Sequence, residues 1–265
     1  MVLHLKIIAV VAVVACFSFT AEAVMQWAPA PAKHGHGGHD RHAAKKFELI
    51  DGEGASVQLI NPQLKAIEIP VEQGVVKVKS TGMDNYHAIV ATRERNGVNE
   101  SAIRYIYQFG KPSGESPSVI MGLEKSKLEI EPSPYAREHW RYYGNTDAVF
   151  VLRFDGKPLA NSTVFLKTEN GTTEKFLTDM DGKITVPLPD DFSNVKPGRM
   201  GNRASEFVLS ANYSDGEISH VTTFSSAYHA NPEHWQSTGL GVAVMAGGMF
   251  LGGLVSWRTR RRKEK

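Results

Sequence analysis

Cysteine is nearly absent from this chain: of its 265 residues, only Cys16 carries a thiol. Cys16 lies in the apolar run at the N-terminus, so the rest of the chain can form no disulfide. It also offers no thiolate to a metal ion or to nucleophilic catalysis. The folded part must therefore depend on burial of apolar side chains, which a body of about 200 residues can supply.

Catalytic sequence motifs are missing as well. The chain contains no Gly-x-Ser-x-Gly elbow, no His-Glu-x-x-His helix and no phosphate-binding loop. Its formal net charge is only +2, and much of that comes from a basic C-terminal end, so no basic nucleic-acid surface is indicated. We therefore expect a protein that is not an enzyme and does not bind nucleic acid.

Residues 1–23 predict a secretory signal peptide. His4 and Lys6 precede an apolar run, and Ala21 and Ala23 form a small-x-small cleavage site. The segment that ends at Cys16 also fits a lipoprotein cleavage box, which would make Cys16 a lipidated first residue. We favour cleavage after Ala23, because a lipid would be redundant beside a helical anchor. In both readings the body is exported.

A second long apolar run lies near the C-terminus, at residues 238–257. It contains no charged residue, and about 20 residues of helix span the ~30 Å hydrocarbon core of a bilayer. Residues 258–265 follow as a basic tail, which marks the cytoplasmic side. The alternative is a buried core helix. We predict a single-pass protein of the cytoplasmic (inner) membrane, with a periplasmic body and a cytoplasmic C-terminus.

The mature chain opens with residues 24–46, which we expect to be a flexible, histidine-rich arm. This segment has few large apolar residues and no alternating pattern. Imidazole suits nickel, cobalt, copper and zinc, and the glycines let several rings fold around one ion. The alternative is a soluble spacer that binds metal only incidentally. The candidate ligands are His34, His36, His39, Asp40 and His42.

The remaining sequence predicts an all-β fold of two antiparallel, sandwich-like domains, at residues 47–132 and 133–225. Short runs alternate apolar and polar residues, and turn residues such as Asn61-Pro62, Asn170-Gly171 and Asp181-Gly182 separate them. Residues 226–237 then form a linker to the apolar helix. The predicted strands lie at residues 56–60, 66–70, 74–79, 86–91, 102–108, 148–154, 163–168, 175–178, 184–188 and 206–213.

Three of these segments carry a resemblance to a known family. Residues 128–132, 150–160 and 178–188 resemble a bacterial periplasmic family associated with cobalt or nickel transport, whose sandwich is similar to those of transthyretin and carboxypeptidase regulatory domains. The similarity covers roughly residues 120–225. It implies an exported β protein that works near a metal-uptake system, and it implies no catalytic residue.

A weaker candidate metal site lies just before the apolar run. His229, Glu233 and His234 fall within six residues and could supply nitrogen and oxygen ligands. The alternative, which we favour, is that Trp235 anchors the chain at the membrane interface and that the histidines are its solvated neighbours.

The apolar run itself predicts helix association. Small residues spaced four apart let helices approach closely, either in a partner membrane protein or in a second copy of this chain. Such glycines are also common in bacterial transmembrane helices without any role in association, and we give the two interpretations equal weight. The residues concerned are Gly239, Ala243, Gly247, Gly248 and Gly252.

Together these features predict a membrane-anchored periplasmic accessory protein. Its arm would capture a transition-metal ion, with nickel or cobalt favoured, and pass it to a metal permease. The alternative is a surface module whose sandwich binds a protein or a glycan, with the arm as a spacer.

Overall fold

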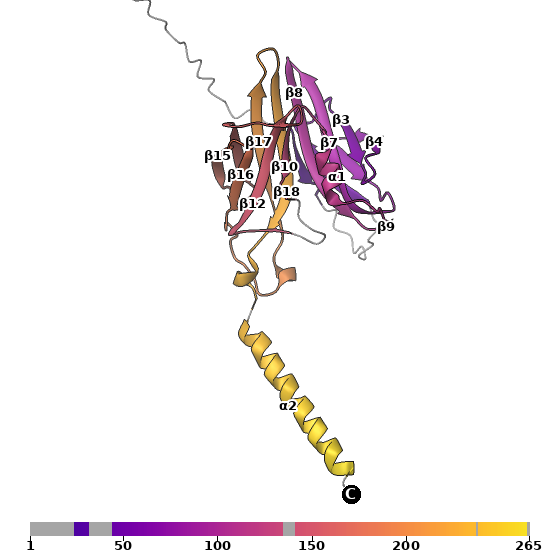
Figure 1. Cartoon of the computed structure of the whole chain (residues 1–265), viewed down its shortest axis with the longest axis vertical. Coiled ribbons are helices and arrows are strands. Elements are labelled where there is room, and N and C mark those ends of the chain that lie inside the picture. The colour runs from indigo at the N-terminus through magenta and orange to yellow at the C-terminus, as the bar shows by residue number, and fades with distance from the viewer. Residues whose placement is uncertain (1–23, 32–43, 135–140, 237, 264–265) are drawn as a thin grey trace, which may run out of the picture.

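The computed structural model describes residues 24–31, 44–134, 141–236 and 238–263. These residues form three β-sheets and one long C-terminal helix that leads away from them (Figure 1). The predicted all-β fold of packed sheets with a single C-terminal apolar helix is therefore confirmed. The histidine-rich stretch at residues 34–42 lies outside the described residues, as does the whole of the predicted signal peptide.

The largest sheet has ten strands and runs through both halves of the body. Its main path follows the order β15-β14-β17-β18-β8-β7-β3-β4, with β11 beside β18 and β9 beside β7. The strands are β3 Ser56–Ile60, β4 Ala66–Glu68, β7 Met83–Arg95, β8 Val98–Gln108, β9 Lys111–Pro112, β11 Tyr142–Tyr143, β14 Thr163–Thr168, β15 Thr173–Leu177, β17 Ser205–Ser214 and β18 Ser219–His229.

Two four-stranded sheets cover parts of this large sheet. The first has the order β1-β2-β6-β5; in the second, β10 and β16 both pair with β12, which also pairs with β13. The first sheet comprises β1 Gln26–Pro29, β2 Lys45–Ile50, β5 Val71–Glu72 and β6 Val75–Val78; the second comprises β10 Leu128–Pro132, β12 Thr146–Phe154, β13 Lys157–Pro158 and β16 Lys183–Leu188.

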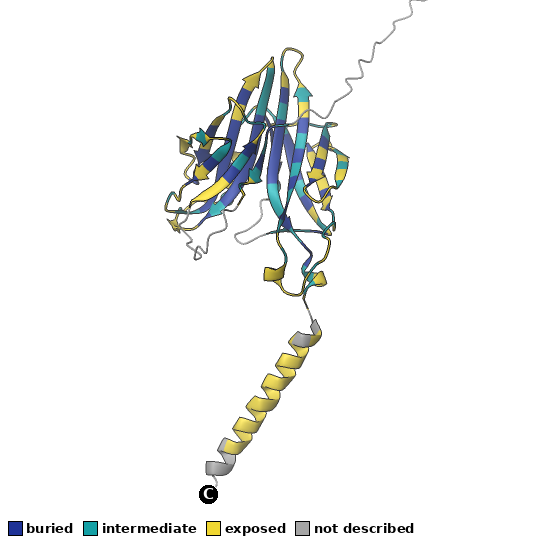
Figure 2. Ribbon diagram, turned by 180° about the vertical axis from the view of Figure 1, so that it is seen from behind, coloured by how far each residue is buried: buried dark blue, intermediate teal, exposed yellow. Residues whose placement is uncertain are grey.

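The small sheets cover opposite faces of the large one, and β7 and β8 are buried on both sides. Successive side chains on a strand point to opposite faces. Ala88 and Val90 of β7 accordingly join the core beneath β10, β12 and β16, whereas Ile89 and Ala91 join the core beneath β1, β2 and β6. Figure 2 shows this buried centre as continuous dark blue along the central strands.

The two halves are joined by β18 and β8, which pair in parallel from Ser219↔Val98 to Phe224↔Ile103. The large sheet therefore continues from one predicted domain into the other. In addition, β10 lies before the predicted boundary at residue 132 but pairs with β12 beyond it. The two sandwich-like halves share one sheet, and one of the two cores contains residues of both halves; the joining strands are parallel rather than antiparallel.

The predicted arm at residues 24–46 differs from what the structure shows at both of its ends. Residues 26–29 form β1, which pairs with β2 across Trp27↔Leu49, and β2 itself starts at Lys45. The side chain of Trp27 is buried, and its Nε1 donates a hydrogen bond to Ala102 O at 3.0 Å. In the chain, the histidine-rich stretch thus lies between two strands that pair with each other, at residues 26–29 and 45–50.

The predicted linker at residues 226–237 also begins too early. Strand β18 continues to His229 and is followed by the short 3-10 helix η2, Pro232–His234. Two further short helices, α1 (Pro117–Gly122) and the 3-10 helix η1 (Arg199–Gly201), lie within the body's connections.

The C-terminal helix α2 spans Thr238–Lys263, so it continues beyond the predicted span into the basic tail. The window Gly241–Arg258 has a mean hydropathy of 1.2 and is wholly exposed. Within the described residues, α2 is the one helix long and apolar enough to cross a membrane. Figure 2 shows it as a continuous exposed rod below the body.

Candidate functional site

Strand β18 links the two regions of the body where polar side chains gather. Its 11 residues, at about 3.3 Å each, place Ser219 roughly 33 Å from His229. Its last residue leads through η2 to α2, so we call that region the α2 end, comprising residues 141–144, 196–203 and 229–236 (Figure 1). The region around Ser219 is called the far end.

Hydrogen bonds hold the α2 end together. The buried side chain of Asn231 caps η2 by accepting from Glu233 N at 2.9 Å and donates to Gly144 O at 3.0 Å. Gly198 N donates to Trp235 O at 3.3 Å, which joins the loop carrying η1 to the residue that follows η2. The three segments of this end are thus fixed to one another.

His229 lies in a small notch at this end, beside two arginines. Its Nε2 is 3.4 Å from Nη1 of Arg141. The pKa of His229 is lowered to about 4, mainly because the ring is buried and to a lesser extent because of the charges of Arg141 and Arg199. The ring is therefore neutral at pH 7. The notch is lined by Arg141, Tyr143, Arg199, Asn202, His229, Ala230 and Trp235.

The other two residues of the weaker predicted metal site lie on η2. Nε2 of His234 is 2.6 Å from Oδ2 of Asp190, and both side chains are about half exposed. Glu233 is exposed. Within the described ranges, no group of three or more histidine, cysteine and acidic residues is placed to hold a metal ion. His229 lies beside arginines and His234 beside Asp190, so the two histidines have different partners.

The main predicted metal ligands lie outside the described residues, but their flanks are placed. Met25 O accepts from Thr223 Oγ1 at 2.7 Å, and Trp27 N donates to Ser225 Oγ at 3.2 Å. Strand β1 therefore advances along β18 toward its His229 end. At the other flank, Lys45 Nζ donates to Tyr107 O, near the end of β8. Both flanks of the histidine-rich stretch thus lie on the side of the body nearer α2.

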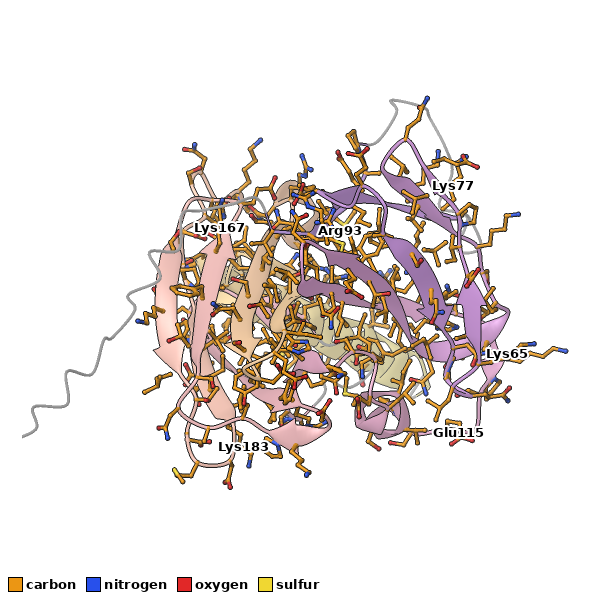
Figure 3. The ribbon with its side chains drawn as sticks, turned by 90° about the horizontal axis from the view of Figure 1, so that it is seen from above. Lys65, Lys77, Arg93, Glu115, Lys167 and Lys183 are labelled. Carbon is orange, nitrogen blue, oxygen red and sulfur yellow. The ribbon has the colours of Figure 1, made fainter. Side chains whose placement is uncertain are left out.

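The far end carries a polar cleft of about 430 Å³. Its walls come from the β7–β8 hairpin, the start of β18 and the segment that leads into β10. Figure 3 shows the labelled Arg93 near the junction of the two halves, whereas the labelled lysines project outward. We call this space the far cleft; it is lined by Gly54, Ser56, Thr92, Arg93, Glu94, Asn99, Glu100, Ser101, Ser126, Lys127, Leu128, His220 and Val221.

Two pairs of polar side chains order the far cleft. The buried guanidinium of Arg93 binds Glu100 Oε2 at 2.5 Å and lies 3.6 Å from Asp51 Oδ2. His220 Nε2 lies 3.3 Å from Asp215 Oδ2, and hydrogen bonds from Ile218 N and Glu217 N, with that of His220, hold the pKa of Asp215 at about 2. The lining of the cleft therefore includes charged side chains of both signs and no phenylalanine, tyrosine or tryptophan.

A third cluster, which was not predicted from the sequence, lies buried between these two ends. Lys125 Nζ is 3.0 Å from Glu131 Oε1 and 3.4 Å from Glu129 Oε2, and all three side chains are at most 1% exposed. Tyr105 OH donates to Glu131 Oε2 at 2.6 Å. Burial raises the pKa of Glu131 to about 7, against the opposing effect of Lys125. In the sequence the two glutamates only alternate with Leu128 and Ile130, which reads as an ordinary half-exposed strand.

The arginines at both ends were likewise not predicted as site residues. Arg141 belongs to a short run of basic and aromatic residues, and Arg93 to a polar segment between two apolar runs. Arg199 sits in a loop with no pattern. Their partners lie 7 to 88 positions away, and only the fold brings them together.

Comparison with known proteins gives no family for this chain. No family model matches it, and no curated protein matches it. Solved structures with partial similarity include a Ca²⁺-stabilised, ice-binding adhesin of an Antarctic bacterium, with 15% identity, 72% of this chain and 44% of that chain covered, and a TM-score of 0.27.

Two other β proteins are similar at the same level. A two-domain fibronectin type III segment of chicken tenascin is 11% identical, with 70% of this chain and 91% of that chain covered and a TM-score of 0.22. A SusE-like, surface-located polysaccharide-binding protein of Bacteroides thetaiotaomicron is 7% identical, with 71% of this chain and 32% of that chain covered and a TM-score of 0.23. This chain thus spans less than half the length of two of the three.

Proposed function

We propose that this protein is a membrane-tethered, non-catalytic interaction module whose far cleft binds a protein or a glycan. The observation that carries the proposal is the position of the cleft. It opens roughly 33 Å along β18 from the end that leads into α2, so a partner outside the membrane can reach it. In this arrangement α2 crosses the cytoplasmic membrane, with its basic end inside and the body outside.

The lining of the far cleft favours a polar partner. It offers amide, hydroxyl and charged groups, and Arg93, Glu100 and Asp51 already hold one another in place. Preordered polar groups of this kind select a partner by complementary hydrogen bonds and charges. A polar protein segment or a glycan meets this requirement better than an apolar small molecule does.

Site-specific photocrosslinking tests this function in cells that make the full chain. A photoreactive residue at Asn99 or Lys127, both in the cleft, is expected to give discrete adducts, and a glycan partner is expected to be lost on glycosidase treatment. The control is the exposed Lys65, outside the cleft (Figure 3). Equal adducts from all three positions, or none from the cleft, would refute the proposal.

Capture of a transition-metal ion for a membrane transporter is the second candidate function. It rests on His34, His36, His39, Asp40 and His42, and on the resemblance of residues 120–225 to a family associated with nickel or cobalt transport. The structure adds one supporting observation. The strands that flank this stretch end on the α2 side of the body, which is where a permease in the same membrane would meet it.

The pairing of β1 with β2 would also help such a site. A stretch whose two ends are already held loses less conformational entropy when it closes around an ion than a free arm does. Nickel or cobalt would then pass to the permease without chemistry, and zinc or copper would suit the same ligands. Contact between α2 and the permease, or a second copy, would use Gly239, Ala243, Gly247, Gly248 and Gly252.

Replacement of His34, His36, His39 and His42 by alanine tests the second candidate. Nickel binding measured by calorimetry is expected to be lost in this variant and kept when His229 and His234 are replaced instead. Binding should also weaken below about pH 6.5, where the rings take up protons. Unchanged affinity in the quadruple variant would eliminate the histidine-rich stretch as the site.

A further inference from the structure

Positively charged side chains gather at the notch of the α2 end. Arg141 and Arg199 both line it, and Lys196 and Arg203 are exposed in the loop that carries η1. Over the described parts of the chain, no carboxylate lies within ion-pair distance of either notch arginine. His229, which is neutral at pH 7, only accepts a hydrogen bond from Arg141.

Two carboxylates close to this end, those of Asp190 and Asp191, already have donors, and a third, that of Glu233, is exposed on η2. Asp190 lies 2.6 Å from His234. Asp191 accepts from Tyr228 OH, Thr168 Oγ1 and Thr172 Oγ1 at 2.5–2.7 Å, and from Asn170 at 3.1 Å. These bonds hold the pKa of Asp191 below its usual value, so it remains ionised and occupied. Among the described residues no carboxylate pairs with either guanidinium, which leaves N–H donors for an anion from outside the body.

The length of the connecting chain fixes how far this notch can stand from the start of α2. Trp235, part of the notch lining, precedes Thr238 by three residues, which span at most about 10 Å. If α2 crosses a bilayer, the Trp235 side of the notch therefore lies within roughly 10 Å of the start of the span, a distance comparable with the Debye length of about 8 Å at physiological ionic strength. Anionic headgroups carry phosphates, and a guanidinium binds phosphate through two parallel hydrogen bonds.

Apolar residues accompany these charges. Met200, in the middle of η1, is 89% exposed, and Trp235 is half-buried beside η2. Tryptophan favours the interface between headgroups and acyl chains. An exposed methionine flanked by Arg199 and Lys196 is the combination expected of a loop that rests on a charged bilayer surface.

We propose that the α2 end is a docking surface for anionic phospholipid headgroups, bound by Arg141 and Arg199 with Met200 against the interface. This inference rests on the proposed membrane tether. Docking fixes the body upright on the bilayer, with the far cleft facing outward. Without it, the link to α2 alone orients the body.

Fluorescence quenching in lipid nanodiscs tests the docking. The full chain carries Cys16→Ser and Met200→Cys, with an environment-sensitive dye on the new thiol, and a quencher is attached to the lipid headgroups. Discs of phosphatidylcholine are compared with discs that contain phosphatidylglycerol. We expect stronger quenching in the anionic discs and loss of the difference in Arg141→Gln/Arg199→Gln. The docked-to-free ratio should fall about five-fold for each arginine removed.

The matched control is Arg95→Gln/Lys127→Gln, which removes two exposed charges at the far end and should keep the effect of lipid charge. Quenching that is independent of lipid charge, or reduced equally by both double variants, overturns the proposal. So does loss of the effect on adding inorganic phosphate at constant ionic strength, because the notch would then bind the free ion. If the chain is not retained in the discs at all, the tether itself is wrong, which is a separate failure.

Discussion

At the scale of single residues, Gly182 shows how a turn is constrained by its neighbours. Its φ is +69°, and a Cβ built there would lie 2.8 Å from both Leu152 O and Leu159 N. Gly97 in the β7–β8 turn has nearly the same φ, +72°, but a Cβ there meets nothing within 4 Å. Comparing substitutions at the two glycines therefore separates the energetic cost of a positive φ from the cost of steric contact.

We predict that Gly182→Ala destabilises the protein more than Gly97→Ala does. The positive φ alone costs an alanine about 1–2 kcal/mol. At Gly182 the clash with two backbone atoms should add about 1–3 kcal/mol, since the neighbouring strands must shift. Urea unfolding of the full chain in detergent, followed by circular dichroism, measures both costs. Equal values would mean that the contacts around Gly182 relax freely.

Glu131 provides a second test at this scale, because burial raises its pKa to about 7. Between pH 4.5 and 7 the folded state keeps a proton that the unfolded chain has already lost. This carboxyl therefore contributes stability at low pH, and the contribution is lost as the pH rises to about 7.

In Glu131→Gln that contribution is absent, while Tyr105 keeps an acceptor. We compare the slope of the free energy of unfolding against pH in the two proteins. Between pH 4.5 and 7 this slope should be more positive in the variant than in the parent, by at most about 1.4 kcal/mol per pH unit. Urea titrations at several pH values provide the measurement. Parallel curves for the two proteins would show that Lys125 keeps Glu131 ionised throughout this range.

At the scale of elements, strand β1 depends on one side chain. Trp27 is 1% exposed, lies between β2 and the large sheet, and donates to Ala102 O on β8. Trp27→Ala should cost about 3–5 kcal/mol, from lost apolar contact and the cavity that remains. Lys46→Ala, an exposed position on β2, should change stability by less than about 0.5 kcal/mol. Similar denaturation midpoints for both variants would mean that β1 is not docked.

Most strands with regular alternation were predicted well from the sequence. Residues 56–60 and 163–168 match β3 and β14 at both ends, because one face of each strand is buried and the other faces water.

The extent of β7 was underestimated, since Thr92–Arg95 look like a polar loop. They extend the strand to a two-residue turn at Asn96-Gly97, where both residues have positive φ. That dipeptide is a hairpin signal that a closer reading of the sequence could have used.

Strand β18 was missed for a different reason. Its buried centre includes Thr222, Thr223 and Ser225, which do not look like core residues. Each hydroxyl has a partner far away in sequence: Ser101 Oγ at 2.9 Å, Met25 O at 2.7 Å and Trp27 N at 3.2 Å, respectively. Buried polar groups are tolerated when they are satisfied in this way. No local pattern could reveal partners more than 100 positions distant.

At the scale of the whole molecule, contacts between residues distant in sequence also explain why the sites were harder to predict than the fold. The histidine-rich stretch and the apolar helix are visible in the sequence because their residues are neighbours. The far cleft and the notch are not, because both combine residues from segments that meet only after β18 pairs with β8 and β17. The sheet that joins the halves is also what sets the cleft and the notch at opposite ends of one strand.

The response of the whole body to acid follows from its buried histidines. Burial lowers the pKa of His87 to about 4, and that of His229 is lowered to about the same value. Between pH 6.5 and 4 the unfolded chain binds protons at these rings that the folded state does not, so each ring makes the protein less stable as the pH falls. Glu131 acts in the opposite direction over part of this range.

We therefore predict that His87→Gln lessens the loss of stability between pH 6.5 and 4. In the folded protein His87 lies 3.1 Å from Asn85 O and 2.7 Å from Thr81 Oγ1, and a glutamine amide can both donate and accept there. The His234→Gln variant is the control, since that ring is exposed beside Asp190. Thermal melts of both variants across the pH range measure the effect. If His87→Gln is as acid-sensitive as the control, protonation of His87 does not drive acid unfolding, and other groups must account for it.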